Sequence, residues 1–360
     1  MALILRVDGE RWRAHLRDVL ERHPGLVPVA KGNGYGFGLG RLARKAQWLG
    51  VDTMAVGTYE ELPHVAQRFD GSLLVLTPWR PGGPAPDNPR LIHTVGRIED
   101  LKTLAEHGSA SGERPRVALE RMTSMLRHGF TAPGLREAAR LVNRDGGVRV
   151  DGVALHLPLA KTARGTSHMS EVERLMNDIV ASGLDKLDHP GSRTIWVSHL
   201  TEMELELLAQ RYPEFTFRPR IGTALWLGDR SALSVRATVL DAHAVERGDI
   251  YGYRGRAAPR HGTILVVSGG TSHGIGLEAP TGDATIRARA ASIARGGLDA
   301  AGLVRSPYTV AGKQRLFAEP PHMQASMLFI PNGTVVPRVG EEIECRVRFT
   351  ATAFDHVEIG

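Results

Sequence analysis

The stretch Val27–Gly40, VPVAKGNGYGFGLG, joins a short apolar run to a glycine-rich loop. Val27–Ala30 is typical of a strand buried in a parallel sheet, and the four glycines among the next eight residues end that strand. Lys31 is therefore expected at the carboxyl end of a strand. Lysine is used sparingly, since only six of the 45 basic residues are lysine. A desolvated lysine can lose its proton and form a Schiff base with a carbonyl, which arginine cannot do, so this position indicates amine chemistry.

Composition narrows the class of protein. The 360 residues are 42% hydrophobic and 23% charged, which is typical of a globular protein with room for two domains. The net charge of +6 comes from arginines scattered among acids, and aromatic residues make up only 6%, so nucleic-acid binding is not favoured. We expect no membrane span, no disulfide framework from the single Cys345, and a cytoplasmic location.

In residues 1–230, short apolar runs alternate regularly with segments of helical character. The eight runs expected to be strands are Val27–Ala30, Thr53–Val56, Leu73–Leu76, Leu91–Val95, Val117–Leu119, Val150–Leu155, Ile195–Val197 and Phe215–Phe217. Eight β–α repeats over about two hundred residues indicate a (β/α)8 TIM-type barrel, whose chemistry lies at the carboxyl ends of the strands.

From residue 231 to 360 the pattern changes to alternation without helices. Ile343, Cys345, Val347 and Phe349 alternate with charged residues, as in a half-buried strand. Further strands are expected at Val235–Val239, Ile264–Val267, Met327–Ile330 and Thr334–Val336. The fold expected is thus α/β plus β, a barrel followed by a C-terminal mostly-β domain to which residues 1–8 can add a strand. Cys345 is interpreted as a buried structural residue.

Two motifs carry a resemblance to a known family. VAKGNGYGFG resembles the pyridoxal 5'-phosphate (PLP) attachment motif of alanine racemases and their fold-type III relatives. The resemblance implies that Lys31 holds PLP as a Schiff base and that Tyr35 contacts its phosphate. FRPRIGTALWLG, on the eighth expected strand, resembles the segment that places Arg220 against the pyridine nitrogen and Gly222 and Thr223 against the phosphate.

Three further segments extend the resemblance around the barrel. ALERMTSMLRHGF resembles the segment whose arginine, here Arg127, contacts the phenolic oxygen of PLP and the substrate, and Glu120 stands where many racemases have a carbamylated lysine. A carboxylate there would supply the same negative charge directly. The resemblance also implies that His156, in GVALHL, packs against the pyridine ring and that Ser198, in WVSHL, lies on the phosphate side.

The substrate side departs from the family. VSGGTSHGIG resembles the segment that holds the second catalytic base, a tyrosine from the partner subunit, but Thr271 occupies that position. A threonine hydroxyl is too weak an acid for this role, so we hypothesise that the neighbouring His273 replaces the tyrosine. In HMQASM, Met323 matches the substrate-carboxylate region, and Gln324 stands where aspartate is common.

The resemblance implies a PLP-dependent racemase that interconverts L- and D-amino acids as a homodimer with shared active sites. A lyase or decarboxylase on the same fold and a non-catalytic PLP-binding homologue are the alternatives. No metal site is expected, since His261, His273 and His322 lack metal-ligand spacing, and a metal-dependent hydrolase would want an HxH pair where this chain has AKGNG.

Overall fold

The computed structural model describes residues 2–83, 88–159, 168–277 and 304–360. Two compact units make up the chain. One unit comprises Ala14–Gly34 and Gly38–Gly228, and the other comprises Met1–Arg13, Tyr35–Phe37 and Asp229–Gly360. We call them the barrel unit and the β-domain. The predicted fold class, a barrel followed by a mostly-β domain, is confirmed.

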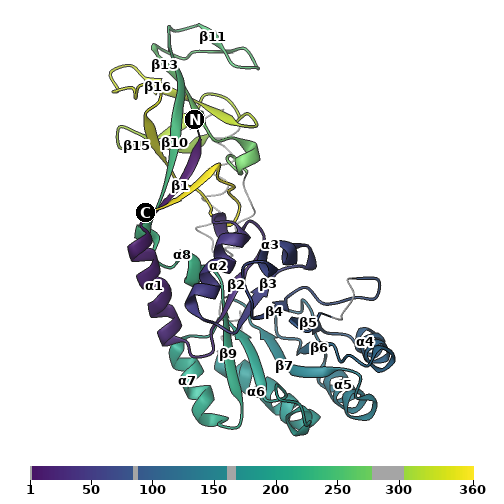
Figure 1. Ribbon diagram of the computed structural model, residues 1–360. Helices are drawn as coiled ribbons and strands as arrows, with labels where there is room; N and C mark the ends of the chain where they lie inside the picture. The colour runs from purple at the N-terminus through teal and green to yellow at the C-terminus, as the bar shows by residue number, and fades with distance from the viewer. Residues whose placement is uncertain (1, 84–87, 160–167, 278–303) are drawn as a thin grey trace. The chain divides into compact units, whose positions relative to one another are not determined.

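Eight parallel strands close the barrel in the order in which they occur along the chain (Figure 1). They are β2 (Val27–Ala30), β3 (Thr53–Val56), β4 (Ser72–Val75), β5 (Leu91–Val95), β6 (Arg116–Glu120), β7 (Arg149–His156), β8 (Thr194–Ser198) and β9 (Thr216–Ile221). β9 pairs with β2 through Val27 and Arg220, which completes the closure. Side chains such as Val29, Ala118 and Trp196 fill the interior, as expected for a packed barrel.

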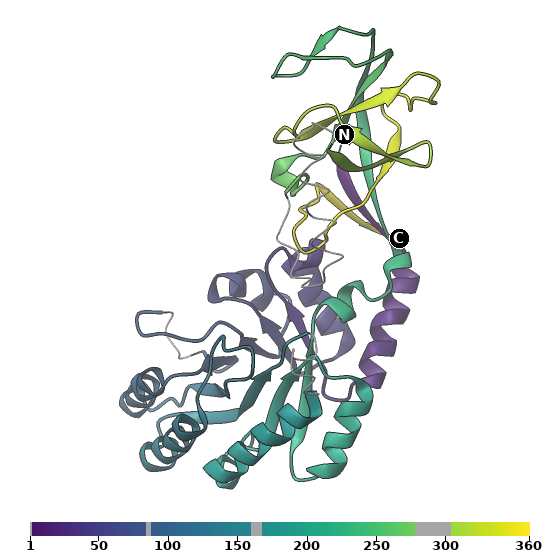
Figure 2. The ribbon, with the colours of Figure 1, turned by 180° about the vertical axis from the view of Figure 1, so that it is seen from behind.

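Helices cover the outside of the barrel, as the view from behind also shows (Figure 2). They are α1 (Gly9–Arg22), which is shared between the two units, α2 (Leu39–Leu49), α3 (Leu62–Ala66), α4 (Ile98–Ser111), α5 (Ala132–Asp145), α6 (His168–Ser182), α7 (Glu202–Arg211) and α8 (Thr223–Leu227). A capping box fixes the start of α7: Thr201 Oγ1 accepts from Glu204 N at 3.3 Å, and Glu204 Oε2 accepts from Thr201 N at 2.8 Å.

The β-domain contains an eight-stranded sheet in the order β13-β16-β15-β14-β17-β10-β1-β18, in which β13 also pairs with β10. The strands are β1 (Leu3–Val7), β10 (Leu233–Val245), β13 (Gly262–Ser268), β14 (Arg305–Val310), β15 (Lys313–Phe317), β16 (Ala325–Pro331), β17 (Glu342–Cys345) and β18 (His356–Ile359). A separate two-stranded ribbon joins β11 (Ile250–Tyr251) and β12 (Arg256–Ala257). β1 pairs with β10 and β18, so the N-terminal segment adds the strand that the sequence allows.

Three strand predictions need correction. Thr334–Val336 is not a strand, because it follows the Asn332–Gly333 turn, precedes a proline and leaves Val335 82% exposed. The strand expected through Phe349 ends at Cys345, although the alternation of burial continues beyond it. The last barrel strand begins at Thr216 and runs to Ile221, so it includes Pro219 and carries Arg220 inside the strand.

Candidate active site

Lys31 follows β2 directly, at the carboxyl-terminal end of the barrel. The carboxylate of Glu61 fixes the backbone around it, since Oε1 accepts from Gly32 N at 2.7 Å and Oε2 accepts from Gly57 N at 2.6 Å. A Cβ on Gly57 would lie 2.9 Å from Lys31 Cβ and 3.0 Å from Glu61 Oε2. A glycine is therefore required for the close approach of these two segments. Glu61 was not predicted from the sequence, where the only local signal for it is the Thr58-x-x-Glu61 capping pattern.

The electrostatic surroundings favour the neutral amine of Lys31. Its pKa is lowered, first by desolvation and then by the positive charges of Arg127 and Arg220, while Glu61 acts in the opposite direction. A lysine with a lowered pKa carries more of the unprotonated amine near neutral pH. It is therefore better suited to attack a carbonyl or to accept a proton than an ordinary surface lysine.

Two arginines and one carboxylate lie next to one another at this end of the barrel. Glu120 ends β6 with a side chain 5% exposed, and its Oε1 lies 3.9 Å from Arg127 Nη2. Arg220 on β9 is buried and donates from Nη2 to Leu155 O at 3.0 Å. Burial lowers the pKa of Arg220 to about 10, with Glu120 opposing the shift, so the guanidinium stays charged at neutral pH.

A neutral histidine completes the barrel site. His156 ends β7, and its Nδ1 lies 2.8 Å from the hydroxyl of Ser198 at the end of β8. Burial, followed by the charges of Arg220 and Arg127, lowers the pKa of His156 to about 3. The ring of His199 contacts that of His156 edge to face, with 5.2 Å between the ring centroids. The backbone of His199 has a φ of +64°, which is unusual for a residue other than glycine. His156 is thus an uncharged flat ring held in place from β8.

Four residues are predicted to contact the phosphate, and the three other than Ser198 lie in two different settings. Gly222 and Thr223 follow β9 directly and begin α8. Tyr35 is buried with φ +55°, and it belongs to the short segment Tyr35–Phe37 that groups with the β-domain. Of the predicted cofactor residues, Lys31, Arg127, His156, Ser198, Arg220, Gly222 and Thr223 belong to the barrel unit.

The predicted substrate-side residues come together in the β-domain. Thr271 and His273 form a short 3-10 turn after β13, and Met323 lies before β16 with 73% of its surface exposed. Backbone hydrogen bonds connect the two segments, from Thr271 N to His322 O at 2.8 Å and from Ser272 N to Met323 O at 3.0 Å. The neighbouring His322 forms a hydrogen bond with Glu319, a contact that was not predicted from the sequence.

The described residues contain neither a membrane-spanning helix nor a cluster of metal-binding side chains. Among residues 2–83, 88–159, 168–277 and 304–360, no helix has the length and apolarity needed to cross a membrane. In the same ranges, no three side chains of the metal-binding types gather into a possible ion site.

Sequence comparison identifies the class of protein to which this barrel and its lysine belong. Residues 7–202, more than half of the chain, match the family model of the alanine racemase N-terminal domain. The protein belongs to the alanine racemase family, a family of PLP-dependent amino acid racemases.

The relatives are distant. The chain is 26% identical to alanine racemase from Mycolicibacterium vanbaalenii over 287 residues. The matched segment covers 73% of this chain and 70% of the relative. Among solved structures, alanine racemase from Bartonella henselae with covalently bound pyridoxal phosphate has a TM-score of 0.73 at 14% identity, covering 100% and 99% of the two chains. Histidine racemase from Leuconostoc mesenteroides has a TM-score of 0.66 at 17% identity, covering 95% and 87%. These two structures show the shared fold.

Proposed function

We propose that the protein is a PLP-dependent racemase that interconverts L- and D-amino acids with PLP attached to Lys31. The observation that carries the proposal is the setting of Lys31. Lys31 directly follows a barrel strand, and the pKa of its amine is lowered by desolvation and by two arginines. Family membership supports the reaction class, while the identity of the amino acid is left open by relatives that include both alanine and histidine racemases.

The predicted cofactor residues fit PLP chemically. Arg220 Nε and Glu120 Oε2 are buried and have no hydrogen-bond partner among the described residues, so one donor and one acceptor are available. Arg220 Nε would donate to the pyridine nitrogen, and Arg127 would face the phenolic oxygen. Uncharged His156 offers a flat face for the pyridine ring. Tyr35, Ser198, Gly222 and Thr223 are the residues that we assign to the phosphate.

The chain's own groups determine which reaction is favoured. Bound PLP supplies an electron-withdrawing ring that acidifies the α-proton of an attached amino acid. Arg220 stays charged and would keep the pyridine nitrogen unprotonated, which limits that withdrawal. Proton exchange at the α-carbon is then favoured over transfer of the amino group. Lys31 Nζ accepts or returns the proton on one face, and Arg127 binds the carboxylate of the substrate.

We also propose a homodimer in which the β-domain of one subunit completes the active site of the other. Thr271 and Met323 support this arrangement, because the resemblance assigns them to the substrate side and both lie in the β-domain. We also propose that the protein is cytoplasmic. This location is supported by the lone Cys345, which is buried and free.

A non-catalytic PLP-binding protein is the second candidate. The observation in its favour is Thr271, whose hydroxyl stands at the position of the family's catalytic tyrosine. Such a protein would bind PLP through Lys31 and release every amino acid unchanged.

Borohydride trapping tests the attachment of PLP directly. Protein incubated with PLP is reduced with sodium borohydride and digested, and we expect the PLP-derived mass on the peptide that contains Lys31. Lys31→Arg keeps the charge but has no amine that can condense, so it should lose the label, whereas Lys45→Arg on α2 should retain it. A label absent from Lys31 in the wild-type protein would contradict the proposal.

A further inference from the structure

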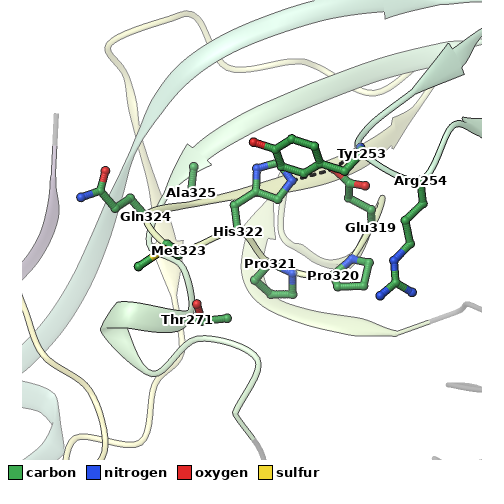
Figure 3. Close-up of a pocket in the computed structure, with 10 residues that line it drawn as sticks. All are labelled: Tyr253, Arg254, Thr271, Glu319, Pro320, Pro321, His322, Met323, Gln324 and Ala325. Atoms are coloured by element: carbon green, nitrogen blue, oxygen red, sulfur yellow. Dashed lines mark hydrogen bonds and ion pairs between the residues drawn. The ribbon is translucent and has the colours of Figure 1, made fainter.

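The β-domain contains a cavity of about 740 Å³, and the assignments above give a role to only some of the residues that line it (Figure 3). Tyr253, Thr271, Glu319, His322 and Met323 are among its lining residues. All of them belong to the β-domain. The cavity is thus lined by Thr271, the residue at the position of the missing tyrosine, together with a histidine and a glutamate that form a hydrogen bond.

His322 and Glu319 form that pair. His322 Nε2 lies 2.6 Å from Glu319 Oε1, as the dashed line in Figure 3 marks, and the two side chains are 28% and 2% exposed. The carboxylate is buried behind an imidazole that reaches the cavity. When Nε2 carries the proton and donates it to Glu319, Nδ1 holds a free lone pair. No hydrogen bond engages Nδ1 within the described part of the chain.

The surrounding backbone is shaped to hold the carboxylate. Tyr253 N donates to Glu319 Oε1 at 3.3 Å. Gly252 has φ +70°, and a Cβ there would lie 2.4 Å from the carboxyl carbon of Glu319, so glycine is required. The ring of Tyr253 lies 4.6 Å from that of His322 between centroids and is tilted by 51°. The imidazole is thus oriented by groups on two separate segments.

His322 also lies next to the position where the catalytic tyrosine is missing. Thr271 N donates to His322 O at 2.8 Å, so the two residues are direct neighbours across the cavity wall. Thr271 itself has only an alcohol of very low acidity to offer. An imidazole can both accept and donate a proton near neutral pH, which the threonine cannot.

His273 has a different setting. Its Nδ1 accepts from Gly270 N at 3.2 Å, its Nε2 lies 3.2 Å from Asp355 Oδ1, and its side chain is 11% exposed. Both ring nitrogens are therefore used within the β-domain, where they hold the turn that carries Thr271. This geometry favours His322 over His273 as the group that exchanges protons with a ligand.

We infer that His322, oriented by Glu319, is the acid–base residue on the face of the α-carbon opposite Lys31, supplied by the β-domain of the partner subunit. The inference rests on the proposed racemase function. In one direction His322 Nδ1 takes the α-proton, the electron pair of the C–H bond stays with the carbon, and the Lys31 ammonium returns a proton to the other face. In the reverse direction the two residues exchange roles. One proton leaves and one arrives, so no oxidant or reductant is needed.

His322→Gln tests the role of the imidazole. Racemisation should fall about 100-fold to 10,000-fold, the usual contribution of a general acid–base. Borohydride-trapped PLP at Lys31 should be unchanged, which shows that the variant is folded and loaded. One enantiomer should still exchange its α-proton with deuterated water through Lys31. His243→Gln is the matched control, because His243 pairs with Asp241 at 3.2 Å on the same domain but is 60% exposed. It should racemise like the wild-type protein.

Mixing two inactive variants tests whether His322 acts across subunits. A dimer of one Lys31→Ala subunit and one His322→Gln subunit contains one site with both wild-type groups. Random re-association of equal amounts should restore about a quarter of the wild-type activity. No recovery, although mixed dimers are detected by mass, would overturn the assignment to the partner subunit.

Glu319 is a positioning residue, and its test does not need PLP. In the cofactor-free wild-type protein, the ¹⁵N shifts of His322 should report a proton on Nε2. Glu319→Gln removes the charged acceptor, so the shifts should move toward a mixture of the two tautomers, and racemisation should fall as well. Unchanged shifts would contradict the orienting role.

The outcomes separate this inference from the proposed function. Wild-type racemisation together with a His322→Gln variant that keeps within about threefold of it would refute His322 and leave the racemase standing. A loaded wild-type protein that neither racemises nor exchanges any amino acid would refute the racemase, and the role of His322 with it.

Discussion

Glu120 is buried beside two arginines. Whether its ionisation stabilises or destabilises the folded protein can be tested. Burial raises the pKa of Glu120, although Arg220, Arg127 and His128 act against the shift. The ionised carboxylate therefore costs folding free energy in the cofactor-free protein. An acid whose folded pKa lies above its unfolded value loses that cost as pH falls through the folded pKa toward 4.5.

Glu120→Gln removes the ionisable group but keeps the shape of the side chain. We expect the cofactor-free variant to be at least as stable as the wild-type protein near neutral pH. Their difference in free energy of unfolding should shrink between neutral pH and the unfolded value, as urea titrations at several pH values would measure. Glu99→Gln, at a side chain 65% exposed, is the control and should change stability by less than about 0.5 kcal/mol. A clear loss of stability in Glu120→Gln at neutral pH would show that the arginines outweigh burial.

Single residues were predictable where a local motif carried them. Lys31 is predicted from a buried strand that ends in glycines, and in the structure it follows that strand directly. Glu61 and the Glu319–His322 pair were missed for different reasons. Glu61 acts on Gly32, which lies 29 residues away, and this contact requires that the neighbouring strands β2 and β3 have paired. Glu319 and His322 are close in sequence, but nothing in a single sequence shows that the carboxylate is buried.

Gly57, one residue beyond β3, tests how one strand end positions another. Gly57→Ala would place a Cβ 2.9 Å from Lys31 Cβ, so the β2 and β3 ends would have to move apart. We expect a loss of about 1–3 kcal/mol in the free energy of unfolding, the usual cost of overpacking, and slower attachment of PLP to Lys31. Urea unfolding and the rate of borohydride-trapped labelling are the measurements.

The control for this change is Gly134→Ala in α5, where the nearest atom is Thr131 Oγ1 at 3.3 Å. Alanine favours helix, so stability should stay within about 1 kcal/mol of the wild-type protein. Equal labelling rates for Gly57→Ala and Gly134→Ala would show that the spacing of the two strand ends does not limit the site.

The elements of the barrel were easier to predict than those of the β-domain. Three barrel strands, among them Val27–Ala30, have the predicted bounds because a buried parallel strand is a continuous apolar run. The β-domain strands Arg305–Val310 and Lys313–Phe317 were missed because charged and polar residues interrupt their apolar pattern. The strand predicted at Thr334–Val336 was wrong, because the sequence of a short apolar run does not show whether the run is buried or exposed.

At the scale of the whole molecule, the proposed shared site requires two subunits. Lys31 belongs to the barrel unit and His322 to the β-domain. Sedimentation of the PLP-loaded protein at working concentration should give a dimer, and activity per subunit should fall on dilution as the dimer separates. Full activity from a purely monomeric species would contradict the shared site.

The most direct test of the central claim is proton NMR of the PLP-loaded protein in deuterated water, with L- and D-forms of candidate amino acids supplied separately. We predict that, for at least one amino acid, the α-proton signal disappears from both enantiomers, since Lys31 serves one face and a second residue serves the other. Lys31→Ala should abolish both losses. Wild-type protein that leaves the α-proton of every enantiomer in place would contradict the account.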